Sequence, residues 1–244
     1  MKITDRSGTP LARDDVMSAL EKDGIVHIFE ASREDFMDQL SPLLKIFPHP
    51  HATGDGWTLI HPHHEPGKTA DEKGFTSAAL PPHTDRGLLN QPPSILFFLL
   101  LRCPSSGGDA LLVDTAKVYR SVSIEELPKL QHELWLESVR YRIRQNLFTV
   151  DDGFCISRYR IDHIAAPIPF SRRTEDLLRE LQKAAAHPTQ IEMLPGQGYL
   201  IHNHRFLHGR TRFTGSRLGV RLLATVADTS AHQWMNRGFA IRQW

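Results

Sequence analysis

The chain has 244 residues, 40% of them hydrophobic, which is enough to bury one substantial core, so we expect a single domain over residues 1–244. Its 29 basic residues nearly balance its 28 acidic ones. This balance gives no reason to expect a nucleic-acid or membrane-surface partner, and we expect a small-molecule substrate. Composition leaves the oligomeric state open.

Three features predict a cytoplasmic protein. The polar residues 1–13 lack the apolar core of a signal peptide. The longest apolar run, 95–101, is too short to cross a bilayer. Cys103 and Cys155 do not form a paired metal-binding spacing, which fits a compartment where thiols stay reduced.

The first 47 residues predict two helices with a strand between them, at 13–22, 25–29 and 33–46. Gly24 closes the first helix, and Ser32 is placed to cap the second. Residues 48–82 are then rich in Pro, Gly and His, with one strand-like patch at 57–61. Because so long an irregular stretch usually has a function, we expect 48–82 to be an active-site lid.

The rest of the chain predicts many short strands, at 94–101, 111–113, 135–145, 154–161, 190–194, 198–202 and 218–227. A capping-box pattern, Ser123 with Glu126, predicts a short helix, and a charged amphipathic helix opens at Ser171 or Thr174 and ends near Ala186. This pattern favours a mainly β fold with peripheral helices, either a barrel or a jelly roll.

The sequence His83-Thr84-Asp85, followed much later by His208, is the main candidate metal site. Two imidazoles and one carboxylate form the facial triad that holds non-haem Fe(II) and leaves positions open for oxygen chemistry. In an extended segment His83 and Asp85 point the same way, as ligands of one metal must.

Other histidines compete with these ligands, because the chain has 14 of them. His63-His64-Glu65 has the same form as the main motif but lies between two prolines, with no strand beside it to direct the side chains. His202 and His204 compete with His208 for the third ligand position. The extended setting favours His83 and Asp85 over the rival motif.

Residues 81–227 resemble the taurine dioxygenase family (TauD/TfdA-like, clavaminate-synthase-like), whose members depend on Fe(II) and 2-oxoglutarate. The resemblance rests on elements that follow one another in order: Pro82-His83-Thr84-Asp85, an apolar strand, Gly107-Gly108-Asp109, Asn203-x4-His208-Gly209-Arg210-x2-Phe213, and Arg217-x3-Arg221. It implies a double-stranded β-helix, or jelly roll, with His83, Asp85 and His208 binding Fe(II).

The resemblance also implies that an arginine after the distal histidine binds the far carboxylate of 2-oxoglutarate. Arg217 and Arg221 fit this pattern, with Arg217 favoured for the cosubstrate and Arg221 for either cosubstrate or substrate. A guanidinium suits the role because it can pair with a carboxylate bidentately and stay charged when buried. One departure is Ala110, where the family often has a threonine whose hydroxyl helps to hold 2-oxoglutarate.

The expected reaction uses O2 and 2-oxoglutarate to oxidise, and most commonly to hydroxylate, a C–H bond, with release of succinate and CO2. Several cations near the motif suit a small polar metabolite or natural-product intermediate that is anionic or amino-acid-like. The candidate substrate residues are Arg86, Arg158, Arg160, His204 and Arg210. The presence of Asp85 disfavours halogenation, for which the wider group replaces this carboxylate with a small residue.

Two other kinds of protein remain open. One is a non-catalytic barrel that binds metal or senses 2-oxoglutarate. The other is a cupin-like dioxygenase that uses Fe(II) and O2 without a keto acid. Arg217 and Arg221 disfavour the cupin-like dioxygenase, because without a keto acid there would be no carboxylate for them to pair with.

Overall fold

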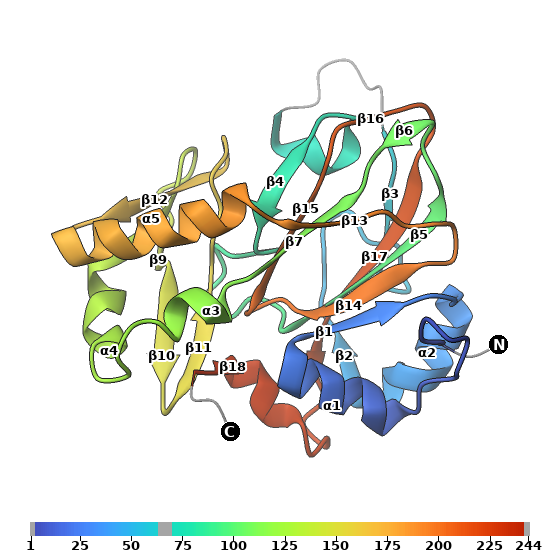
Figure 1. Ribbon diagram of the computed structural model, residues 1–244, viewed down its shortest axis with the longest axis horizontal. Helices are drawn as coiled ribbons and strands as arrows, with labels where there is room; N and C mark the ends of the chain where they lie inside the picture. Colours follow the sequence, from blue (N-terminus) through green and yellow to red (C-terminus); the bar gives the residue numbers. More distant parts are fainter. Residues whose placement is uncertain (1–2, 63–69, 242–244) are drawn as a thin grey trace.

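The structure is a computed structural model that describes residues 3–62 and 70–241. It is mainly β, as predicted, and two antiparallel sheets face each other in a jelly roll (Figure 1). The larger sheet has the order β1-β14-β5-β17-β2, and β3 also pairs with β17. Its strands are β1 (Ile25–Ile28), β2 (Leu44–Ile46), β3 (Trp57–Ile60), β5 (Ile95–Arg102), β14 (Gly198–His202) and β17 (Leu218–Val226).

The smaller sheet has the order β13-β7-β15-β4. Its strands are β4 (Leu80–His83), β7 (Ala110–Asp114), β13 (Thr189–Ile191) and β15 (Phe206–Arg210). The strand predicted at 94–101 is confirmed as β5, and its residues 95–100 are buried on both faces of the sheet. On one face, Ile95, Phe97 and Leu99 pack against the N-terminal helices. On the other face, Leu96 and Phe98 pack with residues of β7 between the two sheets.

Helices α1 (Arg13–Asp23) and α2 (Arg33–Leu40) cover the outer face of the larger sheet (Figure 1). Gly24 ends α1 with a left-handed φ of 74°, and Ser32 forms a capping box with Asp35, so both predicted helix ends are confirmed. The predicted continuation of the second helix to residue 46 is wrong. A 3₁₀ turn, η1 (Ser41–Leu43), contains Pro42, and residues 44–46 pair with β17 as a strand.

A second group of elements packs beside the sheets around its own apolar cluster. It comprises α3 (Ala116–Tyr119), α4 (Leu127–Leu130), η3 (Gln131–Glu133), β8 (Leu134–Ser138), β9 (Arg144–Asn146), β10 (Phe148–Asp151), β11 (Phe154–Ser157), β12 (Ala165–Pro169), α5 (Arg172–Ala186) and β18 (Phe239–Ala240). Three short elements complete the described chain: β6 (Ser106–Gly107), β16 (Phe213–Thr214) and η4 (Gln233–Arg237).

Two sequence predictions in this group need correction. The strand expected at 135–145 is a hairpin of β8 and β9, closed where Ser138 N–H donates to Ile143 O at 2.9 Å. The capping box expected at Ser123 and Glu126 does not form, since α4 begins at residue 127 without a side-chain cap. By contrast, Ser171 is confirmed as the cap of α5.

The segment 48–82 is more regular than its composition suggests, because β3 pairs with β17 and β4 pairs with β15. The 3₁₀ helix η2 (Ala70–Phe75) precedes β4. The rival motif His63-His64-Glu65 lies outside the described residues. Within the described part of the chain, no helix is both long and apolar enough to span a membrane.

Candidate metal and cosubstrate site

Strand pairing in the smaller sheet brings the two candidate histidines together. β4 and β15 are antiparallel, and His83 lies directly opposite His208 in their register. Asp85 follows β4 by two positions. Thr84 fixes the backbone between the two ligands, because its N–H donates to Tyr159 O at 2.8 Å and its hydroxyl accepts from Tyr159 N–H at 3.1 Å.

The side chains of His83, Asp85 and His208 converge on one point. His83 Nε2 lies 3.9 Å from Asp85 Oδ1, and His208 Nε2 lies 3.7 Å from Asp85 Oδ2. One ligand atom from each residue lies within 4.8 Å of the other two. Among the described residues this is the only such convergence of three His, Cys, Asp or Glu side chains.

The protonation states of the three groups suit a metal. His83 Nδ1–H donates to Pro81 O at 3.0 Å, which leaves the Nε2 lone pair facing Asp85. Burial lowers the pKa of His83 to about 3 and that of His208 to about 4. Burial, the largest single effect, would raise the pKa of Asp85, but Arg221 and the neighbouring imidazoles of His208, His83 and His49 together outweigh it, and the pKa falls. Neutral imidazoles and an ionised carboxylate are the forms that bind metals.

Arg221 contacts the candidate ligand set directly. Its Nη1 donates to Asp85 Oδ2 at 2.8 Å, and its Nη2 donates to His49 Nε2 at 3.1 Å. His49 lies in the 48–82 segment, and no sequence pattern indicated that a histidine of this segment would lie at the site. Both terminal nitrogens of Arg221 therefore already have protein partners.

Arg217 has a different environment. Its guanidinium lies over the rings of Phe98 and Phe213, at 5.1 and 5.7 Å from their centroids. The side chain is only 3% exposed, and its Nε has no hydrogen-bond partner among the described residues. Burial lowers the pKa of Arg217. A buried cation without an anion is unfavourable, which makes this position suitable for an anionic ligand.

Arg217 and His208 line the same small cavity, of about 50 Å³, between the two sheets. Ala110 also lines it, so the residue at the family's threonine position does face this space. Tyr199, which the sequence analysis did not single out, lines the cavity as well and brings a phenol that can donate a hydrogen bond. Its position on β14 opposite Phe98 carried no sequence signal beyond that of a core aromatic residue.

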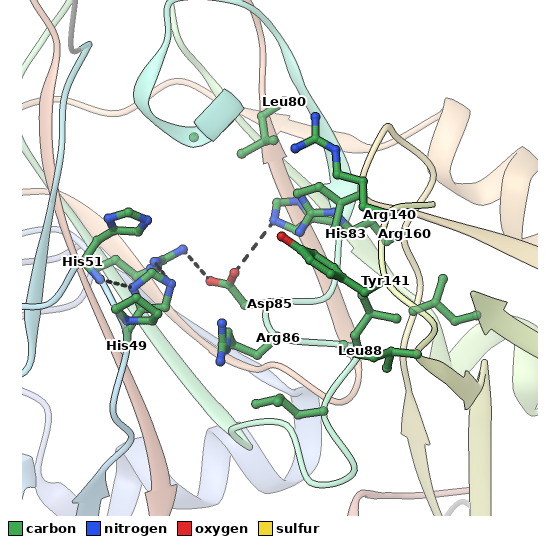
Figure 2. A pocket seen from close by; sticks show the side chains of 18 of the residues that line it. His49, His51, Leu80, His83, Asp85, Arg86, Leu88, Arg140, Tyr141 and Arg160 are labelled. Carbon is green, nitrogen blue, oxygen red and sulfur yellow. Dashed lines mark hydrogen bonds and ion pairs between the residues drawn. The ribbon is translucent and has the colours of Figure 1, made fainter. Parts of the chain in front are cut away.

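A larger cavity of about 420 Å³ opens on the other side of the candidate ligands (Figure 2). His83 and Asp85 line it together with Leu80, Leu88 and Tyr141. Its remaining polar side chains are cationic or imidazole groups: Arg86, Arg140, Arg160, Arg221, His49 and His51. Asp85 is the sole carboxylate among the described residues that line it.

Of the candidate substrate residues, the cavity contains Arg86 and Arg160. Arg86 follows Asp85 in a left-handed backbone conformation, with φ at 57°, and its Nε has no hydrogen-bond partner within the described chain. Arg160 is paired with Asp162, its Nε donating to Oδ2 at 2.9 Å. Figure 2 shows both arginines on the walls around Asp85.

The structure gives the other three candidates structural contacts instead. Arg158 donates to Asn90 O and Thr149 Oγ1, and His204 Nε2 contacts Pro92 O at 2.9 Å. Neither Arg158 nor His204 is among the residues that line the two cavities. Arg210 borders the smaller cavity, but its guanidinium donates to the carbonyls of Lys73, Gly74, Thr76 and Ala78.

This geometry agrees with the comparisons to known proteins. The profile of the taurine catabolism dioxygenase TauD, TfdA family matches residues 6–224, so the chain belongs to that family. A comparison with curated proteins gave no significant match.

Solved structures with the same fold include two oxygenases and a third protein, PvcB. Asparagine oxygenase in complex with Fe(II), 3-hydroxyasparagine and succinate is 19% identical, with a TM-score of 0.52 over 70% of this chain and 57% of that one. The non-haem iron oxygenase OrfP, with Fe, succinate and 3-hydroxyarginine, is 16% identical, with a TM-score of 0.58 over 74% and 62%. PvcB from Pseudomonas aeruginosa is 16% identical, with a TM-score of 0.59 over 88% and 80%. This chain thus spans little more than half of asparagine oxygenase.

Proposed function

We propose that this protein is an Fe(II)- and 2-oxoglutarate-dependent dioxygenase that oxidises, most commonly by hydroxylation, a C–H bond of a small polar substrate. The observation that carries the proposal is the convergence of His83, Asp85 and His208 next to two cavities, one of which is lined by a buried arginine that forms no ion pair within the described chain. The ligand set matches that of non-haem iron oxygenases. Membership of the family supports the same reaction.

The residues present fit both cofactors. The ligand atoms lie 3.7 and 3.9 Å apart, compatible with neighbouring positions around one divalent ion, where bonds of about 2.1 Å place adjacent ligands about 3 Å apart. Arg217 is placed to pair with the far carboxylate of 2-oxoglutarate, and its face-on contacts with Phe98 and Phe213 hold the guanidinium in position.

When bound, Fe(II) and 2-oxoglutarate supply an O2-derived oxidation of a C–H bond, with succinate and CO2 as coproducts. The protein's own part is to hold and aim the reactants. His83, Asp85 and His208 would bind the metal, and the apolar walls of the larger cavity would keep water away from the reacting bond. The segment 48–82 contributes His49, His51 and Phe75 to this cavity, in keeping with a role as its lid.

The substrate we propose is a small metabolite or natural-product intermediate that is anionic or amino-acid-like. A volume of about 420 Å³ is in the range of small-molecule sites. Arg86, with an unpaired Nε on the cavity wall, can bind a carboxylate, sulfonate or phosphate. Asparagine oxygenase and OrfP, which share the fold, were crystallised with hydroxylated amino acids. A cytoplasmic location stays a prediction.

Succinate release tests the proposal. Purified protein with Fe(II), O2 and 2-oxoglutarate is screened against amino acids, small sulfonates and other organic acids, and succinate formation is measured. A substrate-dependent rise in succinate is the expected result. Binding of 2-oxoglutarate without succinate formation from any substrate would favour a sensor, and turnover without any keto acid would favour a cupin-like dioxygenase.

A further inference from the structure

Arg221 is better placed to organise the iron ligand Asp85 than to bind 2-oxoglutarate. Its Nη1 contacts Asp85 Oδ2 at 2.8 Å, and its Nη2 contacts His49 Nε2 at 3.1 Å. Both terminal nitrogens of Arg221 therefore already have a protein partner. Its Nε is buried and has no hydrogen-bond partner among the described residues. The Nε of Arg217 is also buried without a hydrogen-bond partner, and Arg217 forms no ion pair with a described carboxylate, although the charge of Asp109 acts on it.

The contact with Asp85 involves one carboxylate oxygen only. Oδ2 accepts the hydrogen bond from Arg221 and lies 3.7 Å from His208 Nε2, whereas Oδ1 lies 3.9 Å from His83 Nε2. A charge-assisted hydrogen bond from a guanidinium restrains the rotation of a carboxyl group. Arg221 therefore holds the Asp85 carboxylate with its two oxygens close to the two histidines.

His49 in turn fixes Arg221. The chain reaches His49 directly from β2, which is tied to β17 where Phe47 N–H donates to Leu223 O at 2.8 Å. An arginine can only donate, so His49 Nε2 accepts in this contact and the proton of the neutral ring lies on Nδ1. This tautomer excludes the competing contact of 3.2 Å in which His51 N–H would donate to His49 Nδ1. Burial, followed by the nearby charge of Arg221, lowers the pKa of His49 to about 4, and the ring is neutral at neutral pH.

We propose that His49 and Arg221 form a positioning chain for the metal ligand Asp85, which leaves the far carboxylate of 2-oxoglutarate to Arg217, as the family resemblance implies. This inference rests on the proposed function, because it presupposes that Asp85 is a metal ligand. It gives Arg221, for which the sequence left a choice between cosubstrate and substrate, the role of positioning a metal ligand. Groups that orient a ligand in this way typically contribute a factor of about 10–100 to metal affinity.

The test measures binding and not turnover. Mn(II) affinity is titrated in the absence of 2-oxoglutarate, and 2-oxoglutarate affinity is then measured at saturating Mn(II), for the wild type, Arg221→Gln, His49→Phe and Arg217→Gln. We expect Arg221→Gln to weaken Mn(II) binding by about tenfold, with 2-oxoglutarate affinity unchanged. His49→Phe should weaken Mn(II) binding by a smaller factor, and Arg217→Gln should weaken only 2-oxoglutarate binding.

Arg160→Gln is the matched control, because Arg160 lies near both histidines but is paired with Asp162. Removing its charge should leave Mn(II) affinity equal or tighter. This control therefore measures how the loss of a nearby positive charge, by itself, changes Mn(II) affinity. His49→Phe keeps the Arg221 to Asp85 ion pair and tests the chain even if Arg221→Gln folds poorly.

Two results would overturn the inference. One is an Mn(II) affinity of Arg221→Gln equal to or tighter than that of the wild type. The other is a loss of 2-oxoglutarate affinity in Arg221→Gln as large as in Arg217→Gln. Failure of the wild type itself to bind Mn(II) would instead contradict the proposed function, so the two failures are distinguishable.

Discussion

Asn203 and Asp85 hold each other by a reciprocal pair of hydrogen bonds. Asp85 N–H donates to Asn203 Oδ1 at 3.1 Å, and Asn203 Nδ2 donates back to Asp85 O at 3.0 Å. The same amide also donates to Pro93 O at 2.8 Å. Asn203, fully buried at the end of β14, therefore fixes the main chain of a proposed metal ligand that is far away in sequence.

Replacing Asn203 tests how much its two hydrogen bonds with the Asp85 main chain contribute to stability and to metal binding. In Asn203→Ala the buried N–H and carbonyl of Asp85 lose their partner, so we expect a loss of about 2–3 kcal/mol in the free energy of unfolding and about tenfold in Mn(II) affinity. Denaturant unfolding and Mn(II) titration measure the two effects. Unchanged metal affinity in the folded variant would mean that the contacts of Thr84 and Arg221 position Asp85 without Asn203.

His208→Ala should abolish both divalent-metal binding and 2-oxoglutarate decarboxylation, because it removes one of only three protein ligands. Mn(II) titration and succinate release provide the two readouts. His132→Ala, a change at an exposed histidine, is the control and should retain both. Retained activity in His208→Ala would remove this residue from the ligand set.

Arg217→Gln should raise the 2-oxoglutarate concentration needed for half-maximal succinate release by about 10–100-fold, since a hydrogen bond to a charged group contributes about 1.5–3 kcal/mol. Mn(II) affinity should not change, because Arg217 does not contact the candidate metal ligands. An unchanged 2-oxoglutarate requirement would assign the role to Arg221.

Tyr199 is positioned to supply the hydroxyl that Ala110 lacks. Tyr199→Phe should weaken 2-oxoglutarate binding by about fivefold, the equivalent of one neutral hydrogen bond. Adding Ala110→Thr to this variant should restore part of the affinity, whereas Ala110→Val, of similar size but without a hydroxyl, should not. Equal effects of threonine and valine would show that only cavity volume matters at position 110.

Arg210→Gln tests whether Arg210 anchors the segment before β4. Its guanidinium donates to the carbonyls of Lys73, Gly74, Thr76 and Ala78, and these contacts tie the segment to β15. The variant should be cleaved faster by trypsin at Lys73, in a time course followed by mass spectrometry. Unchanged cleavage together with weaker substrate binding would support the alternative role of Arg210 as a substrate residue.

Local sequence patterns predicted the fold class and most elements correctly, but they erred where tertiary pairing decided the outcome. Residues 44–46 continue a helical pattern, yet Pro42 and the free edge of β17 make them a strand. The run 135–145 is uniformly strand-like, and only the pairing of β8 with β9 reveals the turn within it. Such errors are expected because burial and pairing partners are non-local.

The sequence by itself determined which residue types are available to bind a metal, and the extended setting of His83 and Asp85 made them neighbours on one side of the chain. Only the tertiary structure decided how the two arginines differ. They lie four residues apart, Arg217 just before β17 and Arg221 within it, and both line the small cavity. The ring of Phe98 lies beside the guanidinium of Arg217, whereas Asp85 and His49 contact that of Arg221. These neighbours come from β5 and from the segments after β4 and β2, whose approach to β17 depends on how the sheets assemble.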